Sequence, residues 1–87
     1  MTWQIELTAR ARKELGKIGA KEGRRIIEFL RRLESLDNPR QRGKALRGEL
    51  AEFWRFRVGR CRLICEIQDQ KLLILVLRIG HRSQVYR

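Results

Sequence analysis

The period of the hydrophobic pattern changes between the two halves of this chain, and that change constrains the fold more than any other feature. Between residues 9 and 36 apolar side chains recur at helical spacing, whereas between residues 53 and 80 they follow the patterns of β-strands. No repeat, low-complexity tract or linker interrupts the 87 residues, so we expect one domain over residues 1–87. Helices followed by strands indicate an α+β fold, with the helices packed on a small sheet.

The first half of the chain predicts one strand and two helices. Residues 2–7 (TWQIEL) alternate between polar and apolar side chains, as a half-buried strand does. Thr8 can then cap a short amphipathic helix that ends near Gly19. A second helix is expected over residues 21–36, with one apolar stripe and an arginine-rich opposite face, and residues 37–43 (DNPRQRG) end it with the only proline.

The second half predicts three antiparallel strands. In residues 53–58 (FWRFRV) apolar side chains alternate with arginine, and Gly59 can open a tight hairpin into residues 61–67 (CRLICEI). A turn at residues 69–70 leads into residues 71–80, which are apolar on both faces over most of their length, as a covered central strand is. The predicted order is β-α-α-β-β-β, with two N-terminal helices on a small, mostly antiparallel sheet.

The charge of the chain constrains its partner. The net charge is +11, and the basic residues are sixteen arginines and five lysines. Arginine binds phosphate through a planar, weakly hydrated fork of donors. This excess favours a nucleic acid or an acidic protein as the partner, with a membrane surface as a weaker third choice.

Cysteine usage and hydropathy indicate the compartment. Cys61 and Cys65 are four residues apart in one predicted strand, about 13 Å along it, which is too far for a disulfide. With one histidine in the chain a zinc site is not expected, and both cysteines are read as small buried apolar residues. The apolar stretch 72–77 is too short to span a bilayer, and the N-terminus lacks the pattern of a signal peptide. We therefore expect a soluble cytoplasmic protein without a metal or cofactor.

One face of the predicted sheet concentrates arginine. Arg55 and Arg57 project from the same side of one strand, and the hairpin brings Arg62 close to them on the next. Like charges side by side destabilise a sheet, and a bound phosphate backbone would offset that repulsion. The alternative is a solvated sheet face in a chain that uses arginine heavily.

The C-terminal residues 80–87 (GHRSQVYR) hold the only histidine and the only tyrosine, and they can fold back over this face. No carboxylate cluster fits a two-metal nuclease, so phosphodiester cleavage here would be metal-independent and would use the 2′-OH of RNA as nucleophile. Arginines would stabilise the charge that develops on the phosphate oxygens. Because arginine stays protonated, the general base is left open among Tyr86, His81 and a carboxylate such as Glu66.

Three segments together carry a family resemblance: KALRGEL at 44–50, FWRFRVGRCRLICEI at 53–67 and GHRSQVY at 80–86. With them the chain resembles, over nearly its whole length, the RelE/ParE superfamily of toxins from bacterial and archaeal toxin–antitoxin pairs. The resemblance implies the RelE fold. RelE-like members are ribosome-dependent endoribonucleases that cut mRNA in the A site by 2′-OH attack, whereas ParE-like members act on DNA gyrase and lack that catalytic set.

The resemblance also implies the site. Two basic residues on one strand of the RelE-type site match Arg55 and Arg57, and an arginine on the next strand matches Arg62. An arginine after the last strand matches Arg82, and a tyrosine near the end matches Tyr86. With all five positions filled, the RelE-like reading is favoured. The predicted catalytic residues are Arg57, Arg62, Arg82 and Tyr86, and the predicted substrate-binding residues are Arg55, Lys44, Arg47 and His81.

One departure from the RelE pattern affects the general base. The best-known pattern has lysine at the positions of Arg55 and Arg57, and Arg57 cannot accept a proton as lysine can. The base then shifts to Tyr86, with a pKa lowered by neighbouring cations, or to His81. A related branch uses a glutamate on the preceding loop, where this chain has Lys44.

The partners implied by the resemblance are a small acidic RelB-like antitoxin, the 70S ribosome and mRNA. The antitoxin is expected to bind across the helical face and the C-terminal region, and operator DNA is expected to be bound only through the antitoxin. Two other readings stay open. One is a ParE-like inhibitor of DNA gyrase with the same fold, and the other is an inactive module that binds only its antitoxin.

Overall fold

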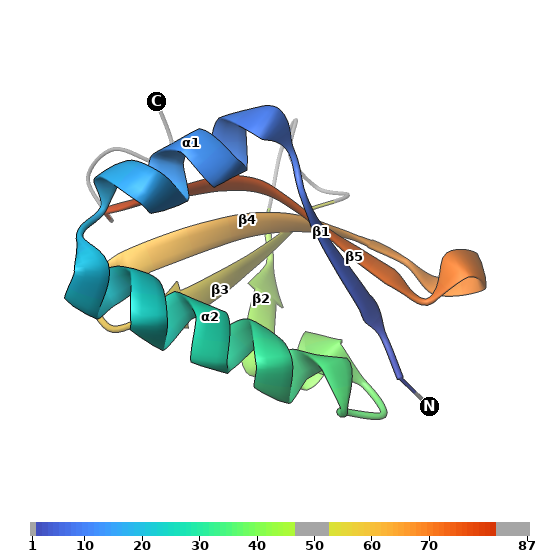
Figure 1. The fold of residues 1–87 in the computed structure, drawn as a ribbon. Helices are drawn as coiled ribbons and strands as arrows, with labels where there is room; N and C mark the ends of the chain where they lie inside the picture. The colour runs from blue at the N-terminus through green and yellow to red at the C-terminus, as the bar shows by residue number, and fades with distance from the viewer. Residues whose placement is uncertain (1, 47–52, 82–87) are drawn as a thin grey trace.

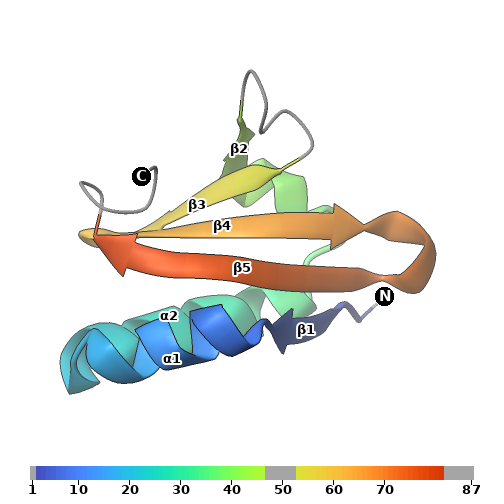
Figure 2. The same ribbon diagram turned by 90° about the horizontal axis from the view of Figure 1, so that it is seen from above.

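The computed structural model describes residues 2–46 and 53–81, which form a five-stranded sheet with two helices on one face (Figures 1 and 2). The elements, in chain order, are β1 (Gln4–Leu7), α1 (Ala9–Lys17), α2 (Ala20–Glu34), η1 (Pro39–Arg42), β2 (Gly43–Ala45), β3 (Trp54–Val58), β4 (Cys61–Gln68), η3 (Asp69–Lys71) and β5 (Leu73–His81), η marking a 3₁₀-helix. The strand order is β1-β5-β4-β3-β2, with β1 parallel to β5 and the other pairs antiparallel. The predicted α+β fold is confirmed.

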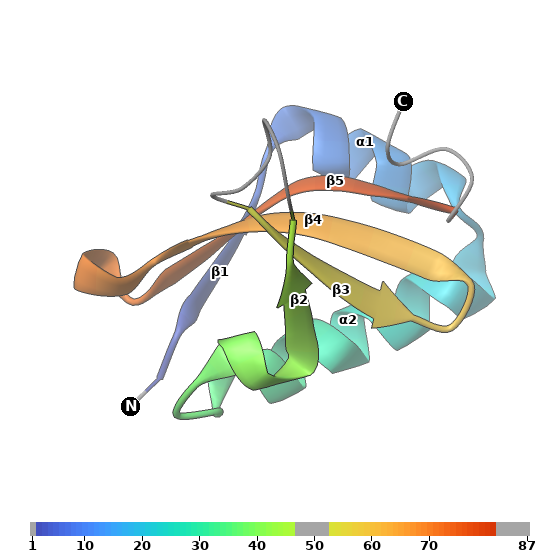
Figure 3. The same cartoon turned by 180° about the vertical axis from the view of Figure 1, so that it is seen from behind.

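The sheet has one strand more than the pattern predicted. β2 forms the edge of the sheet and is only three residues long, so it has no alternating apolar pattern to reveal it. Gly43 allows β2 to approach β3 closely, because a Cβ there would lie 2.9 Å from both the carbonyl oxygen of Arg55 and a ring carbon of Phe56. Figure 3, which views the molecule from behind, shows β2 in front of the other strands, next to β3. Residues 37–43, which were predicted to end the second helix, thus contain η1 and the first residue of this strand.

The helices form where the sequence predicts them. The N-cap of α1 is Thr8, whose Oγ1 accepts a hydrogen bond from the backbone N–H of Ala11 (3.0 Å) and so satisfies one of the free donors of the first turn. Gly19, with φ 103°, separates the two helices. α2 buries Ile26, Leu30 and Leu33 against the sheet, one stripe of an amphipathic helix. No helix in residues 2–46 or 53–81 has the length and apolar character needed to cross a membrane.

The core lies between the helices and the sheet. Its largest fully buried side chains include Phe56, Leu63 and Ile74, and each contributes about 1.5–3 kcal/mol by leaving water. Cys61 and Cys65 are both buried and both free, as predicted. Burial alone raises the pKa of the Cys65 thiol, and burial followed by the nearby Glu22 carboxylate raises that of Cys61. Both therefore act as apolar residues and not as nucleophiles.

A bulge in β5 decides which of its side chains face the helices. Ile64 pairs with Arg78 and Cys65 with Val76, so Leu77 has no partner on β4. Strict alternation from the buried Val76 would direct Arg78 into the core. The bulge shifts the alternation by one residue, so that Ile79 is buried instead and Arg78 lies beside Ile64 on the other face.

Candidate functional site

The predicted arginine cluster forms on the face of the sheet that the helices leave uncovered. We call Lys44, Arg55, Arg57 and Arg62 the basic face. Lys44 pairs with Arg55 across β2 and β3, and Arg57 pairs with Arg62 across β3 and β4. Residues two apart on a strand share a face, so Arg55 and Arg57 point the same way. The short Gly59 hairpin, with φ 59° at the glycine, sets the register that places Arg62 opposite Arg57.

Arg62 differs from the other members of the basic face because it is buried. Its exposed fraction is 6%, and it is the one buried charged residue in the described part of the chain. Its Nη1 donates to the carbonyl oxygen of Cys61 (3.4 Å). The alternating pattern predicts only that Arg62 lies on the face away from the helices. In the structure every residue of Cys61–Cys65 is buried, so both faces of β4 are covered around Arg62, which the alternating pattern did not predict.

Burial gives the Arg62 guanidinium two properties that suit a catalytic cation. A charge that is shielded from water is screened less, so it acts more strongly on a neighbouring phosphate. A side chain that is largely buried and hydrogen-bonded is also already ordered, so binding costs it little conformational entropy. Arg57, directly opposite, is exposed and offers a second guanidinium from the solvent side.

A pocket at the β2–β3 edge gathers the rest of the basic face. Its lining residues are Gln41, Arg42, Gly43, Lys44, Arg55 and Arg57. Lys44 and Arg57 are exposed, and Arg55 is half-buried. Arg42 was not among the predicted site residues, because it stands in residues 37–43, which were expected only to end the second helix. The one sign in the sequence that Arg42 could join the basic face was its position two residues before Lys44.

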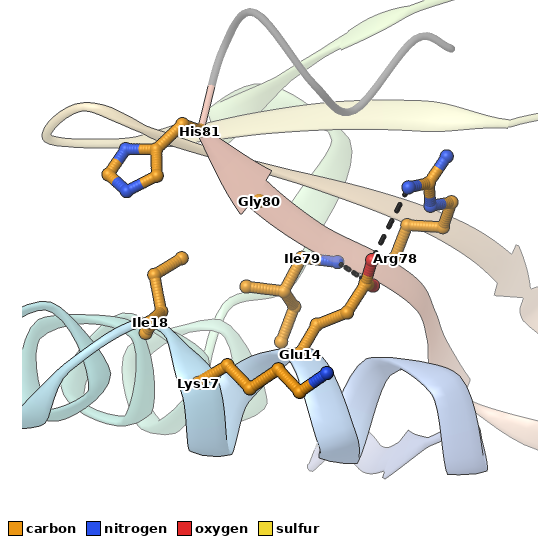
Figure 4. A pocket seen from close by; sticks show the side chains of 7 residues that line it. All are labelled: Glu14, Lys17, Ile18, Arg78, Ile79, Gly80 and His81. Carbon is orange, nitrogen blue, oxygen red and sulfur yellow. Dashed lines mark hydrogen bonds and ion pairs between the residues drawn. The ribbon is translucent and has the colours of Figure 1, made fainter.

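His81 lies away from this pocket. It pairs with Cys61 at the end of β5, so its position falls on the helix side of the sheet, whereas Arg62 pairs with Gly80. It lines a different pocket, beside α1, shown in Figure 4. The residues of that pocket are Glu14, Lys17, Ile18, Arg78, Ile79, Gly80 and His81. The structure therefore does not bring His81 together with Arg57.

Glu66, the carboxylate left open as a base, is also distant from Arg62. It lies four residues further along β4, about 13 Å at the rise of a strand. Its Oε1 accepts a hydrogen bond from Nε2 of Gln68 (2.6 Å). The other predicted site residues, Arg47, Arg82 and Tyr86, lie outside the described residues.

The end of β5, from which the C-terminal segment continues, is held by α1. The pairing of β1 with β5 stops at Val76. Beyond it, Oγ1 of Thr8 donates to the carbonyl oxygen of Leu77 (3.0 Å), and the backbone N–H of Ile79 donates to Oε1 of Glu14 (2.9 Å). Oε2 of Glu14 also accepts from Nη2 of Arg78 (3.3 Å). Side chains of α1 thus replace a missing strand along the edge of β5 (Figure 4).

Comparison with known proteins shows the family to which this chain belongs. A family model described as the ParE toxin of the type II toxin–antitoxin system parDE matches residues 5–86. The chain belongs to this toxin family. Over 87 residues the toxin is 33% identical to Toxin RelG of Mycobacterium tuberculosis, which covers all of this chain and 99% of that one.

Solved structures of RelE toxins have a fold similar to that of this toxin. The RelBE2 toxin–antitoxin complex of Mycobacterium tuberculosis matches it with a TM-score of 0.86 and 31% identity, over 94% of this chain and 100% of that one. The archaeal RelE–RelB complex of Pyrococcus horikoshii matches with a TM-score of 0.75 and 25% identity, over 98% and 100%. The free RelE toxin of E. coli, at 21% identity and a TM-score of 0.77 over 97% and 88%, shares the fold.

Proposed function

We propose that this toxin is a ribosome-dependent, metal-independent endoribonuclease that cleaves mRNA in the A site. The observation that carries the proposal is the pair formed by buried Arg62 and exposed Arg57, which face one another across β3 and β4. Two guanidinium groups at one register position suit a phosphate whose non-bridging oxygens gain charge in the transition state. The similarity to Toxin RelG and to RelE structures supports the same reading.

The reaction needs one new bond and two proton transfers. The 2′-oxygen bonds to phosphorus and loses its proton to a base, while the bond from phosphorus to the 5′-oxygen breaks and that oxygen takes a proton. Arg62 and Arg57 stabilise the pentacoordinate phosphate between these events. We assign the base to Tyr86 and a third cation to Arg82, following the family resemblance. His81 is a poor base here, because its pocket lies beside α1.

The proposed partner that neutralises the toxin is a small acidic antitoxin of the RelB type. The net charge of +11 favours an acidic partner, and two of the matching structures are complexes with an antitoxin. We propose that operator DNA is bound only through that antitoxin, and that the toxin acts in the cytoplasm, where ribosomes and mRNA are.

The test is to express the toxin alone and to map the 5′ ends of mRNA on isolated ribosomes. We expect new ends within the A-site codon, and none when Arg57 and Arg62 are both replaced by alanine. Growth arrest with intact mRNA on the ribosomes would contradict the proposal. If expression of the toxin without an antitoxin does not slow growth, the result would favour an inactive module that binds only its antitoxin.

The second candidate is inhibition of DNA gyrase, which the description of the matching family model favours. An inhibitor of this kind provokes a DNA damage response soon after induction, whereas an mRNA endonuclease does not provoke one directly. Measuring that response beside the mapping of mRNA ends therefore separates the two functions in one experiment.

A further inference from the structure

The basic face continues beyond the predicted site toward the edge of the sheet. Arg42 is the last residue of η1, directly before β2, and it lines the same pocket as Arg57, which pairs with Arg62. From the β2 edge to β4 this gives three guanidinium side chains, Arg42, Arg57 and Arg62. Adjacent strands are about 4.8 Å apart, so the three together span more than a single phosphate.

The pocket that Arg42 lines also contains a pair of basic residues from neighbouring strands. Lys44 pairs with Arg55 one step along the strands, and both line the pocket with Arg42 and Arg57. Three exposed cationic side chains, Arg42, Lys44 and Arg57, therefore line one hollow, with half-buried Arg55 beside them. Such a cluster repels itself, and a bound anion relieves the repulsion.

The segment that presents Arg42 is anchored on both sides. The guanidinium of Arg40 binds both carboxylate oxygens of Asp69 (2.8 and 2.7 Å) and lies over the ring of Trp54, 5.6 Å from its centroid. Pro39 is buried, and Gly43 packs against β3. Because η1 and β2 are fixed in this way, the pocket exists before a ligand binds, and little ordering opposes binding.

We propose that this pocket binds the phosphate of a nucleotide adjoining the cleaved bond, with Arg42 as its outermost ligand. The RNA strand then crosses the sheet from β4 toward β2, with the reacting phosphate between Arg62 and Arg57 and the neighbouring phosphate in the pocket. The inference rests on the proposed function for the identity of the strand. It assigns Arg42 to substrate binding and to no step of the chemistry.

The first test measures binding without cleavage. The probe is a short single-stranded DNA oligonucleotide, which has phosphates and no 2′-OH. Arg42→Ala is expected to lower the affinity about 5- to 10-fold, as the loss of one charged hydrogen-bonded contact does. The slope of log affinity against log salt is expected to become shallower by about 0.7, the value for one phosphate contact on a single strand.

The matched control is Arg12→Ala, which removes the same charge from the exposed side of α1. It is expected to leave the slope unchanged, and Arg42→Lys is expected to restore it. Equal affinities and equal slopes for Arg42→Ala and Arg12→Ala would overturn the proposal, because the effect of Arg42 would then be only its share of the net charge.

The second test separates the mRNA strand from ribosomal RNA, which carries the same phosphates. Binding of the toxin is compared on ribosomes whose mRNA continues through the A site and on ribosomes whose mRNA ends before it. Arg42→Ala is expected to weaken binding only to the first. An equal loss on both would overturn the assignment, since the pocket would then hold ribosomal RNA. The two proposals can also fail separately. If the wild-type toxin leaves mRNA intact while Arg42→Ala still makes the salt dependence of binding shallower, the proposed cleavage is wrong and the phosphate pocket is supported.

Discussion

Arg62 is the residue on which the proposed chemistry depends most. Removing a preorganised cation that stabilises a transition state costs about 10²- to 10³-fold in rate. We expect Arg62→Ala to lower the rate of mRNA cleavage by that much in single-turnover assays on programmed ribosomes. Arg62→Lys is expected to recover only part of it, because lysine cannot form the forked contact. Thermal unfolding of both variants shows whether they still fold, and full activity in a folded Arg62→Ala variant would contradict the assignment.

His81 provides the opposite case at the same scale. It is exposed, and it lines the pocket beside α1 and not the one that holds Arg57. We expect His81→Ala to change the rate of cleavage less than about threefold, within the range of a surface contact and well below the 10²-fold or more of a lost general base. A fall of 10²-fold, with the affinity for ribosomes unchanged, would return His81 to the set of candidate bases.

At the scale of elements, the end of β5 depends on α1. Oε1 of Glu14 accepts a hydrogen bond from the part-buried backbone N–H of Ile79 at the strand edge, and removing the carboxylate removes that acceptor. We expect Glu14→Ala to lower the free energy of unfolding by about 1–3 kcal/mol, the cost of leaving a part-buried polar group unpaired. Amide exchange at Ile79 should accelerate in the same variant.

The matched variant is Glu14→Gln, which keeps an oxygen acceptor for Ile79 and loses the charge that pairs with Arg78. It is expected to retain most of the stability and most of the protection of the Ile79 amide. If both variants lose the same amount of unfolding free energy, the ion pair with Arg78, and not the hydrogen bond to the Ile79 N–H, holds the end of β5.

These elements also show where the sequence was sufficient. The two helices and the Gly59 hairpin follow from local patterns of the sequence. The same patterns place Arg55, Arg57 and Arg62 on one face of the sheet, because alternation fixes the face of each strand residue and the tight turn fixes the register between the two strands. The bulge at Leu77 could not be predicted from the sequence. It keeps Arg78 out of the core and buries Ile79, and that need arises only once β5 packs against the core. Arg42 was missed for a related reason: it ends η1 directly before a three-residue edge strand, and such a strand is stabilised by its neighbour and not by its own pattern.

At the scale of the whole molecule, charge makes stability depend on pH. The chain carries +11, so protonation of its carboxylates adds to an existing repulsion. Asp69 is the carboxylate that links η3 to η1, and the hydrogen bonds from Arg40 hold its pKa below the usual value. A carboxylate with a lowered pKa in the folded state stabilises the fold above its unfolded pKa, near 3.9, and loses that effect as the pH falls through the folded value.

We therefore expect the free energy of unfolding to fall as the pH drops below about 4, in urea titrations between pH 2.5 and 7. Asp69→Asn should be less stable than the wild type at pH 7 and should show a weaker dependence on pH in that acid range. Glu28→Gln, an exposed carboxylate on α2, is the matched control and should follow the wild type. Added salt should restore part of the lost stability at low pH, because it screens the repulsion among the many cations. Identical acid profiles for Asp69→Asn and Glu28→Gln would show that net charge alone, and not the Arg40–Asp69 pair, determines the acid sensitivity of the toxin.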